Sequence, residues 1–175
     1  MTLQRLRLAK NEDKRLRSGH LWIYSNEVDA SATPRRNFSA GEHVVVENQQ
    51  GKSLGVAYVN PQSLICARLM SHDERPIDVN FLKKRIKSAL ALRETLYEHP
   101  CYRLIYGESD LLPGLVVDRF GDHLSVQLNT AGMDAMRDII IEALVRMLQP
   151  QSILLRNDAA VRKLEGLELE VVTAY

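Results

Sequence analysis

The sequence has no apolar run of about 20 residues, the length that an α-helix needs to span a bilayer. Its first residues, MTLQRLRLAKNEDK, lack the apolar central region of a secretory signal peptide. Hydrophobic residues make up 45% of the 175 residues and charged residues 26%, which is typical of a soluble globular protein. We therefore expect a cytoplasmic protein that does not insert into a membrane.

Cysteine is scarce, and neither Cys66 nor Cys101 stands at the spacing of a zinc-binding pair such as CxxC. The five histidines are scattered singly along the chain. Without a secretory signal, two reduced and partly buried thiols are expected. The sequence therefore predicts no metal site.

Motifs of several enzyme classes are also missing. The chain has no GxGxxG or GxxxxGK[ST] nucleotide-binding loop, no GxSxG nucleophile turn and no HExxH zinc motif. No pattern in the sequence places a nucleophile beside its base. From the residues alone we therefore expect neither catalytic nor cofactor-binding residues in this chain.

Basic residues are clustered, although the net charge of the chain is only +1. One cluster surrounds the aromatic segment GHLWIY at residues 19–24, and two arginines follow in a loop-like stretch. Cationic side chains neutralise backbone phosphates, and histidine or aromatic rings stack on unpaired bases, so this region is a candidate RNA-binding site. Its expected contact residues are Lys14, Arg15, Arg17, His20, Trp22, Arg35 and Arg36.

Two other interpretations of this region stay open. Trp22 also fits a core position, because a small β-barrel commonly buries a large ring. The basic residues also fit an ordinary solvated face. A second basic group, made of Lys83, Lys84, Arg85 and Lys87, lies on the outer face of a predicted helix.

The order of predicted elements indicates an α+β protein. Residues 1–73 predict a small β-barrel, because short strands alternate with turn signals. Residues 74–100 predict a linker and then a helix, which Asp78 caps and Pro100 closes. Residues 101–175 predict an α/β domain in the order strand, hairpin, helix and strand.

Local signals predict several details of these elements. Leu6 and Leu8 alternate with arginines, which predicts a half-buried strand, and Asn11 is expected to cap a short helical turn. The helix after the linker is expected to bury an apolar stripe that ends at Tyr97. One amphipathic helix is expected over residues 133–148.

Three carboxylates, Glu108, Asp110 and Asp118, lie close together in the sequence. Paired carboxylates are typical of acid–base chemistry, which makes a small hydrolase one interpretation. Their setting favours another, because Asp110 precedes a loop with Pro113 and Gly114, where short acidic side chains commonly accept hydrogen bonds from backbone amides. We therefore expect a structural turn.

Polar residues also follow the strand predicted at residues 152–157. Arg156, Asn157, Asp158 and Arg162 stand near its carboxyl end, where side chains of an open α/β sheet often face a ligand. The other interpretation is that Asn157 or Asp158 caps the short helix that follows.

Four segments resemble parts of one known family. RLRSGHLWIY (15–24) and YVNPQSLICARLMS (58–71) resemble the opening and closing strands of a PUA-type RNA-binding domain. GESDLLPGLVVDRFGDHLSVQ (107–127) and RNDAAVRKLEGL (156–167) resemble the central α/β domain of the large-subunit ribosomal RNA methyltransferase I family. The four segments span nearly the whole chain in the family's order, and the second pair is the more specific.

This resemblance implies an S-adenosylmethionine-dependent enzyme that methylates C5 of cytosine in 23S ribosomal RNA. In such enzymes a C-terminal Rossmann-like domain carries the S-adenosylmethionine site and a cysteine that attacks C6 of the base. Neither Cys66 nor Cys101 stands in a motif of that kind. We therefore expect this chain to lack the catalytic domain, to bind no S-adenosylmethionine itself and to be inactive alone.

The expected function is the RNA-binding, substrate-recognition portion of such a methyltransferase, with ribosomal RNA as its partner. The alternative is a standalone RNA-binding or protein-docking adaptor without enzymatic activity. In that case the ELEVV segment at residues 168–172 would offer an exposed strand edge for homodimerisation.

Overall fold

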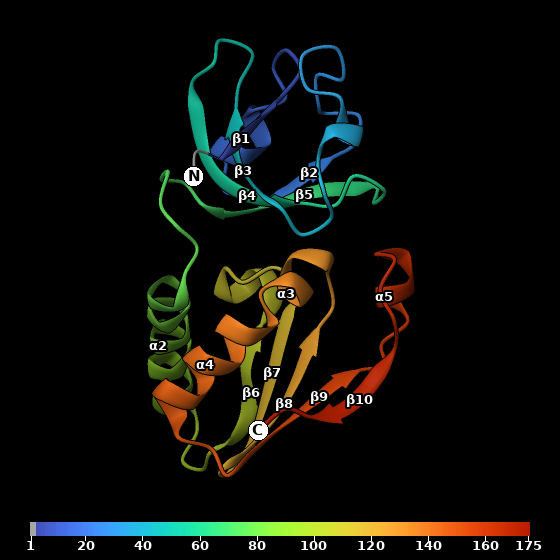
Figure 1. The fold of residues 1–175 in the computed structure, drawn as a ribbon. Coiled ribbons are helices and arrows are strands. Elements are labelled where there is room, and N and C mark those ends of the chain that lie inside the picture. The colour runs from blue at the N-terminus through green and yellow to red at the C-terminus, as the bar shows by residue number, and fades with distance from the viewer. Residues whose placement is uncertain (1–2) are drawn as a thin grey trace. The chain divides into compact units, whose positions relative to one another are not determined.

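The chain folds into two compact units, which divide between Arg75 and Pro76. The computed structural model describes residues 3–175. Each unit contains one five-stranded sheet (Figure 1), and the second unit also carries two long helices. The predicted α+β class is therefore confirmed.

The first unit is built around the sheet β1-β3-β4-β5-β2, in which β1 is parallel to β3 and the other neighbours are antiparallel. A bridge between Leu8 and Val28 connects the segments that follow the two edge strands, so the sheet curls toward the predicted barrel. Its described elements are β1 (Gln4–Arg7), α1 (Lys14–Arg17), β2 (Trp22–Tyr24), η1 (Arg35–Asn37), β3 (His43–Glu47), β4 (Ser53–Val59) and β5 (Ile65–Ser71).

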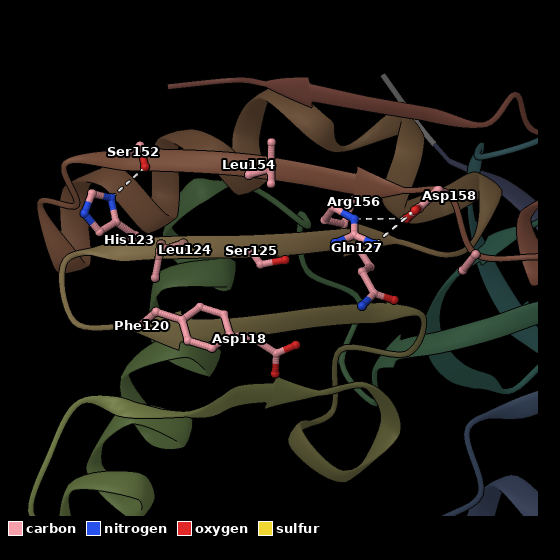
Figure 2. Close-up of a pocket in the computed structure, with 11 residues that line it drawn as sticks. Asp118, Phe120, His123, Leu124, Ser125, Gln127, Ser152, Leu154, Arg156 and Asp158 are labelled. Carbon is pink, nitrogen blue, oxygen red and sulfur yellow. Dashed lines mark hydrogen bonds and ion pairs between the residues drawn. The ribbon is translucent and has the colours of Figure 1, made fainter.

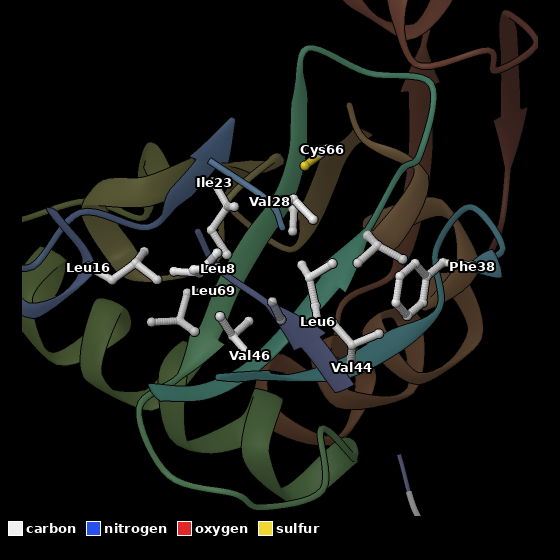
Figure 3. Packing of buried hydrophobic residues seen from close by; sticks show 13 residues of the cluster. Leu6, Leu8, Leu16, Ile23, Val28, Phe38, Val44, Val46, Cys66 and Leu69 are labelled. Carbon is white, nitrogen blue, oxygen red and sulfur yellow. The ribbon is translucent and has the colours of Figure 1, made fainter. Parts of the chain in front are cut away.

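The core of the first unit lies on one face of this sheet (Figure 3). Leu6 and Leu8 are each 1% exposed, as their alternation with arginines predicts. Ile23 of β2 packs into the same cluster, as do Val44 and Val46 of β3, which share a face because they are two residues apart on one strand. Burial of this apolar layer stabilises the unit by roughly 25 cal/mol per Å² removed from water.

The short helix α1 begins later than predicted. The predicted cap by Asn11 is wrong, because Asn11 takes a left-handed backbone conformation with φ 69° and the residue at the N-cap position is Asp13. Asn11 therefore turns the chain before the helix instead of capping it, a conformation that asparagine tolerates better than most residues.

The second unit is built around the sheet β10-β9-β8-β7-β6, in which β8 and β9 are parallel and the other neighbours antiparallel. The helices α2 and α4 contact one another and cover one face of the sheet (Figure 1). Its described elements are α2 (Val79–Leu96), β6 (Cys101–Tyr106), η2 (Gly107–Asp110), β7 (Leu115–Phe120), β8 (His123–Leu128), α3 (Ala131–Ala135), α4 (Arg137–Leu148), β9 (Ser152–Asn157), α5 (Val161–Leu164) and β10 (Glu170–Thr173).

Helix α2 begins as predicted, because the Asp78 carboxylate accepts a hydrogen bond from the backbone N–H of Phe81 at 2.8 Å. Leu82 and Ile86 are almost completely buried. The predicted burial of Tyr97 is wrong: its side chain is 52% exposed. Tyr97 lies just past the helix, where the backbone is extended, and its ring stacks on Tyr102 with centroids 5.3 Å apart.

The amphipathic helix predicted over residues 133–148 is two helices. The backbone leaves the helical range at Met136, which ends α3 and precedes α4. α3 also starts earlier than predicted, because the Thr130 hydroxyl accepts the backbone N–H of Met133. Met133, Met136 and Ile140 all stay buried across this bend, as the predicted apolar face requires.

Candidate nucleic-acid interface

Arg15 connects the basic helix α1 to strand β2. Its guanidinium donates to Oε1 of Glu27 at 2.7 Å and lies 5.0 Å from the centre of the Tyr24 ring. The other oxygen of Glu27 accepts the backbone N–H of Tyr24 at 2.7 Å. This hydrogen bond from Arg15 to Glu27 also raises the pKa of the guanidinium above its ordinary value. Arg15 therefore holds α1 against β2 and stays charged.

Trp22 stands on the outer side of the sheet. Its register partner is Arg68, whereas Ile23, its neighbour on β2, pairs with Ala67 and faces the core. The Trp22 side chain is 37% exposed, and its ring meets Tyr24 edge to face with centroids 6.4 Å apart. The interpretation of Trp22 as the core aromatic is therefore wrong.

The basic residues predicted to contact RNA differ in whether their side chains already have a partner within the protein. Arg17 pairs with Asp13 at 2.7 Å, and Arg35 donates to the carbonyl oxygen of Pro61 at 2.8 Å. Within residues 3–175, the side chains of Lys14 and Arg36 have no ion-pair or hydrogen-bond partner, and both residues are exposed. Lys14 and Arg36 thus keep their full hydrogen-bonding capacity for an anionic ligand. His20 is exposed as well.

Cys66 on strand β5 is a buried thiol. Burial raises the pKa of the Cys66 thiol to about 11, while the positive charge of Arg35 acts to lower it and the negative charge of Glu27 acts to raise it. The buried Cys66 thiol is therefore protonated and unreactive at neutral pH. Sequence patterns did not reveal Glu27, because its partner Arg15 is 12 residues away.

The acidic run after β6 is a structural turn, as its setting predicts. The Asp110 carboxylate accepts two hydrogen bonds from the Arg93 guanidinium, at 2.9 and 2.7 Å, and a third from the backbone N–H of Tyr106 at 2.7 Å. Asp118 pairs with Arg103 at 2.8 Å on the sheet surface. Because Asp110 and Asp118 bind arginines, the interpretation of these residues as an acid–base pair loses its support.

Asn157, the last residue of β9, and Arg162 of α5 have structural roles that neither interpretation of the sequence anticipated. Asn157 is completely buried; its Oδ1 accepts the backbone N–H of Leu128 at 2.8 Å, which ties the ends of the parallel strands β8 and β9 together. Arg162 is 2% exposed and donates to the carbonyl oxygens of Leu128 and Glu168 and to Asp134. Neither Asn157 nor Asp158 caps α5, whose N-cap residue is Ala160.

A pocket of about 690 Å³ lies on the second sheet (Figure 2). Arg156 and Asp158 line it, two of the four residues for which a ligand-facing position was one interpretation of the sequence. Two pairs of its polar groups are internal to the pocket: Arg156 binds Asp158 at 3.1 Å, and Nδ1 of His123 lies 2.8 Å from the Ser152 hydroxyl. Side chains from β7, β8, β9 and the segment after β9 line it: Asp118, Phe120, His123, Leu124, Ser125, Gln127, Ser152, Leu154, Arg156, Asp158 and Ala159.

Residues 3–175 contain neither a candidate membrane-spanning helix nor a candidate metal site. No helix in this range is long and apolar enough to cross a membrane. No group of three or more histidine, cysteine, aspartate or glutamate side chains in the same range is arranged to hold a metal ion.

Comparison with known proteins agrees with this architecture. Residues 6–72 match the family described as a PUA-like domain. Over 168 residues the chain is 40% identical to ribosomal RNA large subunit methyltransferase I of Vibrio cholerae, and the match covers 94% of this chain and 41% of the relative. The chain is homologous to the N-terminal part of the ribosomal RNA large subunit methyltransferase I family. It spans about two fifths of the length of these methyltransferase I relatives.

Other relatives and solved structures give the same result. The methyltransferase I of Escherichia coli K12 is 40% identical over 169 residues, covering 94% of this chain and 42% of the relative. A structure from Streptococcus mutans, assigned as a SAM-dependent methyltransferase, matches with a TM-score of 0.77 at 17% identity, over 99% of this chain and 43% of that chain. At that identity the structural match establishes the fold alone.

Proposed function

We propose that this chain is the RNA-recognition portion of an S-adenosylmethionine-dependent methyltransferase that acts on C5 of cytosine in 23S ribosomal RNA. The support is the 40% identity to methyltransferase I relatives over 94% of the chain, together with the match of residues 6–72 to a PUA-like domain. The relatives' name supplies the ribosomal RNA substrate and the methyl transfer. The choice of cytosine C5 follows from the family resemblance of the central domain.

The observation that carries the proposal is the exposed ring of Trp22 in a basic region. Trp22 is 37% exposed on the outer side of β2, and α1, which Arg15 holds against β2, presents Lys14 without a partner. Exposed rings stack on unpaired bases, and cations beside them neutralise the phosphates. We assign base stacking to Trp22 and His20 and phosphate contacts to Lys14 and Arg36. We assign positioning to Arg15 and Arg17, which are ion-paired, and to Arg35, which donates to a backbone carbonyl.

Trp22 is the only tryptophan of the chain, so its fluorescence reports directly on the proposed site. We expect a single-stranded RNA oligonucleotide to quench this fluorescence. The logarithm of the binding constant should fall linearly with the logarithm of the salt concentration, with a slope of about −0.7 per phosphate contact.

Variants assign the contacts, with binding followed by the anisotropy of labelled RNA. The slope of the logarithm of the binding constant against the logarithm of the salt concentration is called the salt slope. Lys14→Ala and Arg36→Ala should each reduce the magnitude of the salt slope by about 0.7. Trp22→Ala should weaken binding by about 1–3 kcal/mol, the cost of a lost stacking contact, while Trp22→Phe should retain most of the affinity. Lys52→Ala, which removes an exposed charge from the β3–β4 turn, is the control. Salt-independent binding, or equal losses in Lys14→Ala and the control, would refute this site.

We also propose that residues 3–175 do not themselves bind S-adenosylmethionine. The motivation is that the chain contains no glycine-rich nucleotide-binding motif. Isothermal titration of S-adenosylmethionine into the chain should give no heat of binding, and micromolar affinity would contradict this assignment.

A protein-docking role is the second candidate, and the edge strand β10 favours it. Val171 is 56% exposed and Val172 41% exposed on this strand, and an exposed strand edge can pair with a second copy. Light scattering would then give a dimer mass that falls to the monomer mass in Val172→Lys. A monomer at all concentrations would exclude this role.

A further inference from the structure

The first half of helix α2 carries a concentrated positive charge. Residues 79–92 contain Lys83, Lys84, Arg85 and Lys87 and no carboxylate. The buried residues of the same helix are Phe81, Leu82, Ile86 and Ala89, so its apolar side faces the core of the second unit. Lys84 and Lys87 are exposed and Lys83 is half-buried on the outer side.

These lysines lack the partners that other surface cations of this unit have. Arg103 pairs with Asp118 and Arg146 with Glu142. Among the described residues, no carboxylate lies within ion-pair distance of Lys83, Lys84 or Lys87. The charge of Lys83, Lys84 and Lys87 is therefore uncompensated within the part of the chain that the structure describes.

Folding alone does not favour this arrangement. Lys83 and Lys87 are four residues apart and Lys84 and Lys87 three apart, spacings at which like charges on a helix repel. A bound polyanion would relieve this repulsion, whereas an ordinary solvated face would gain nothing from concentrating the charge here.

We propose that Lys83, Lys84 and Lys87 form a second contact site for the RNA phosphate backbone, separate from the Trp22 site of the first unit. Lysine binds phosphate as a point charge without strict geometry, so it suits a backbone read without regard to sequence. The axial distance from Lys83 to Lys87 is about 6 Å at 1.5 Å per residue, which keeps the three ammonium groups along one stretch of backbone.

A membrane surface is a poorer ligand for α2 than RNA, and the pocket on the second sheet is a poorer site for RNA than α2. A helix that lies in a membrane interface must insert its apolar face, but Leu82 and Ile86 are committed to the core. The pocket on the second sheet is a poorer site for a polyanion, because its arginine Arg156 is already neutralised by Asp158. The unpaired lysines of α2 are the stronger attractor for phosphate.

This inference rests on the proposed function, since the ligand is the same RNA, and the test separates the two. The full chain carrying Lys84→Gln and Lys87→Gln is titrated with a labelled single-stranded RNA over a range of salt concentrations. Two lost phosphate contacts should reduce the salt slope by about 1.4 and weaken binding on the order of 25-fold at 0.1 M salt. Glutamine has nearly the helix propensity of lysine, so α2 should remain folded.

The matched control is Lys52→Gln with Lys163→Gln, which removes the same charge from two other exposed positions. Equal losses in the two double variants would overturn the α2 site, because they would reflect net charge alone. Unchanged binding of the α2 variant beside a wild type that quenches Trp22 would overturn the α2 site and leave the proposed function intact. A wild type that binds no RNA would refute both. Binding to anionic lipid vesicles that the α2 variant loses, with RNA binding intact, would replace RNA by a membrane surface.

Discussion

Arg93 on helix α2 and Asp110 after strand β6 form a nearly buried, doubly hydrogen-bonded ion pair. The two N–O distances are 2.9 and 2.7 Å, and the side chains are 12% and 6% exposed. The same carboxylate accepts the backbone N–H of Tyr106. One aspartate thus fixes both the loop that follows β6 and the position of α2 on the second unit, which makes this acidic run a scaffold.

Replacing Asp110 by alanine should lower the free energy of unfolding by about 3–5 kcal/mol. The reason is that the substitution leaves the buried Arg93 guanidinium without its counter-charge. Urea denaturation followed by circular dichroism measures the change. Asp118→Ala is the matched control, because it breaks the pair with Arg103, whose side chain is 44% exposed. That exposed pair should contribute less than about 1 kcal/mol, so similar losses in the two variants would contradict the assignment.

Gly114 should tolerate alanine much less well than Gly121. Both have positive φ, 86° and 63°, so alanine costs about 1–2 kcal/mol of backbone strain at either position. A Cβ at Gly114 would also lie 2.4 Å from the Thr130 hydroxyl oxygen, whereas nothing lies within 4 Å of one at Gly121. Overpacking adds about 1–3 kcal/mol, which thermal denaturation would detect as a clearly lower Tm for Gly114→Ala. Equal Tm values for the two variants would contradict the close approach.

The two thiols should react at very different rates. Cys101 is exposed, whereas Cys66 is buried and burial raises the pKa of its thiol to about 11. Since the thiolate is the reactive form, a disulfide reagent at pH 8 should label one thiol per chain quickly and the second only after denaturation. Cys101→Ser should abolish the fast phase and Cys66→Ser should leave it unchanged. A fast phase that survives in Cys101→Ser would place Cys66 at the surface.

Sequence patterns that involve only residues close together in the chain predict most helices and strands of this fold. The alternation at Leu6 and Leu8 locates β1, and the carboxylate of Asp78 starts α2, because both depend on neighbours along the chain. The turn chemistry around Asp110 likewise predicts a structural role. The partner of Asp110 is less predictable, since Arg93 lies 17 residues away on a different element.

The structural roles missed by the sequence patterns in the second unit depend on residues far apart in the chain. Asn157 reaches Leu128, 29 residues earlier, and Arg162 reaches the same residue across 34 residues. No periodicity marks such contacts, so the sequence leaves a ligand-facing position open for both residues and a capping role open for Asn157. The exposure of Trp22 was also undecided, because its neighbour Ile23 fits the core equally well and the register of β2 against β5 settles which of them faces inward.

Glu170 should make the stability of the second unit sensitive to acid. The hydrogen bond from Asn157, at 3.1 Å, lowers the pKa of the Glu170 carboxyl below its ordinary value, and the positive charge of Arg137 lowers it further. A carboxyl with a lowered pKa in the folded state binds fewer protons there than in the unfolded chain. Its stabilisation is therefore fully present above the unfolded pKa of about 4.3 and is lost as the pH falls through the lower folded value.

The measurement compares the free energy of unfolding of the wild type and Glu170→Gln between pH 7 and pH 3. Glutamine keeps an oxygen for Asn157 but cannot ionise, so the variant should lose less stability than the wild type below about pH 4.3. Arg137→Gln, which removes the cation but keeps the carboxylate, should give an intermediate acid dependence. Parallel curves for wild type and Glu170→Gln would show that the carboxylate is not stabilised in the folded state. The hydrogen bond between β9 and β10 through Asn157 would then be no stronger for a charged acceptor than for a neutral one.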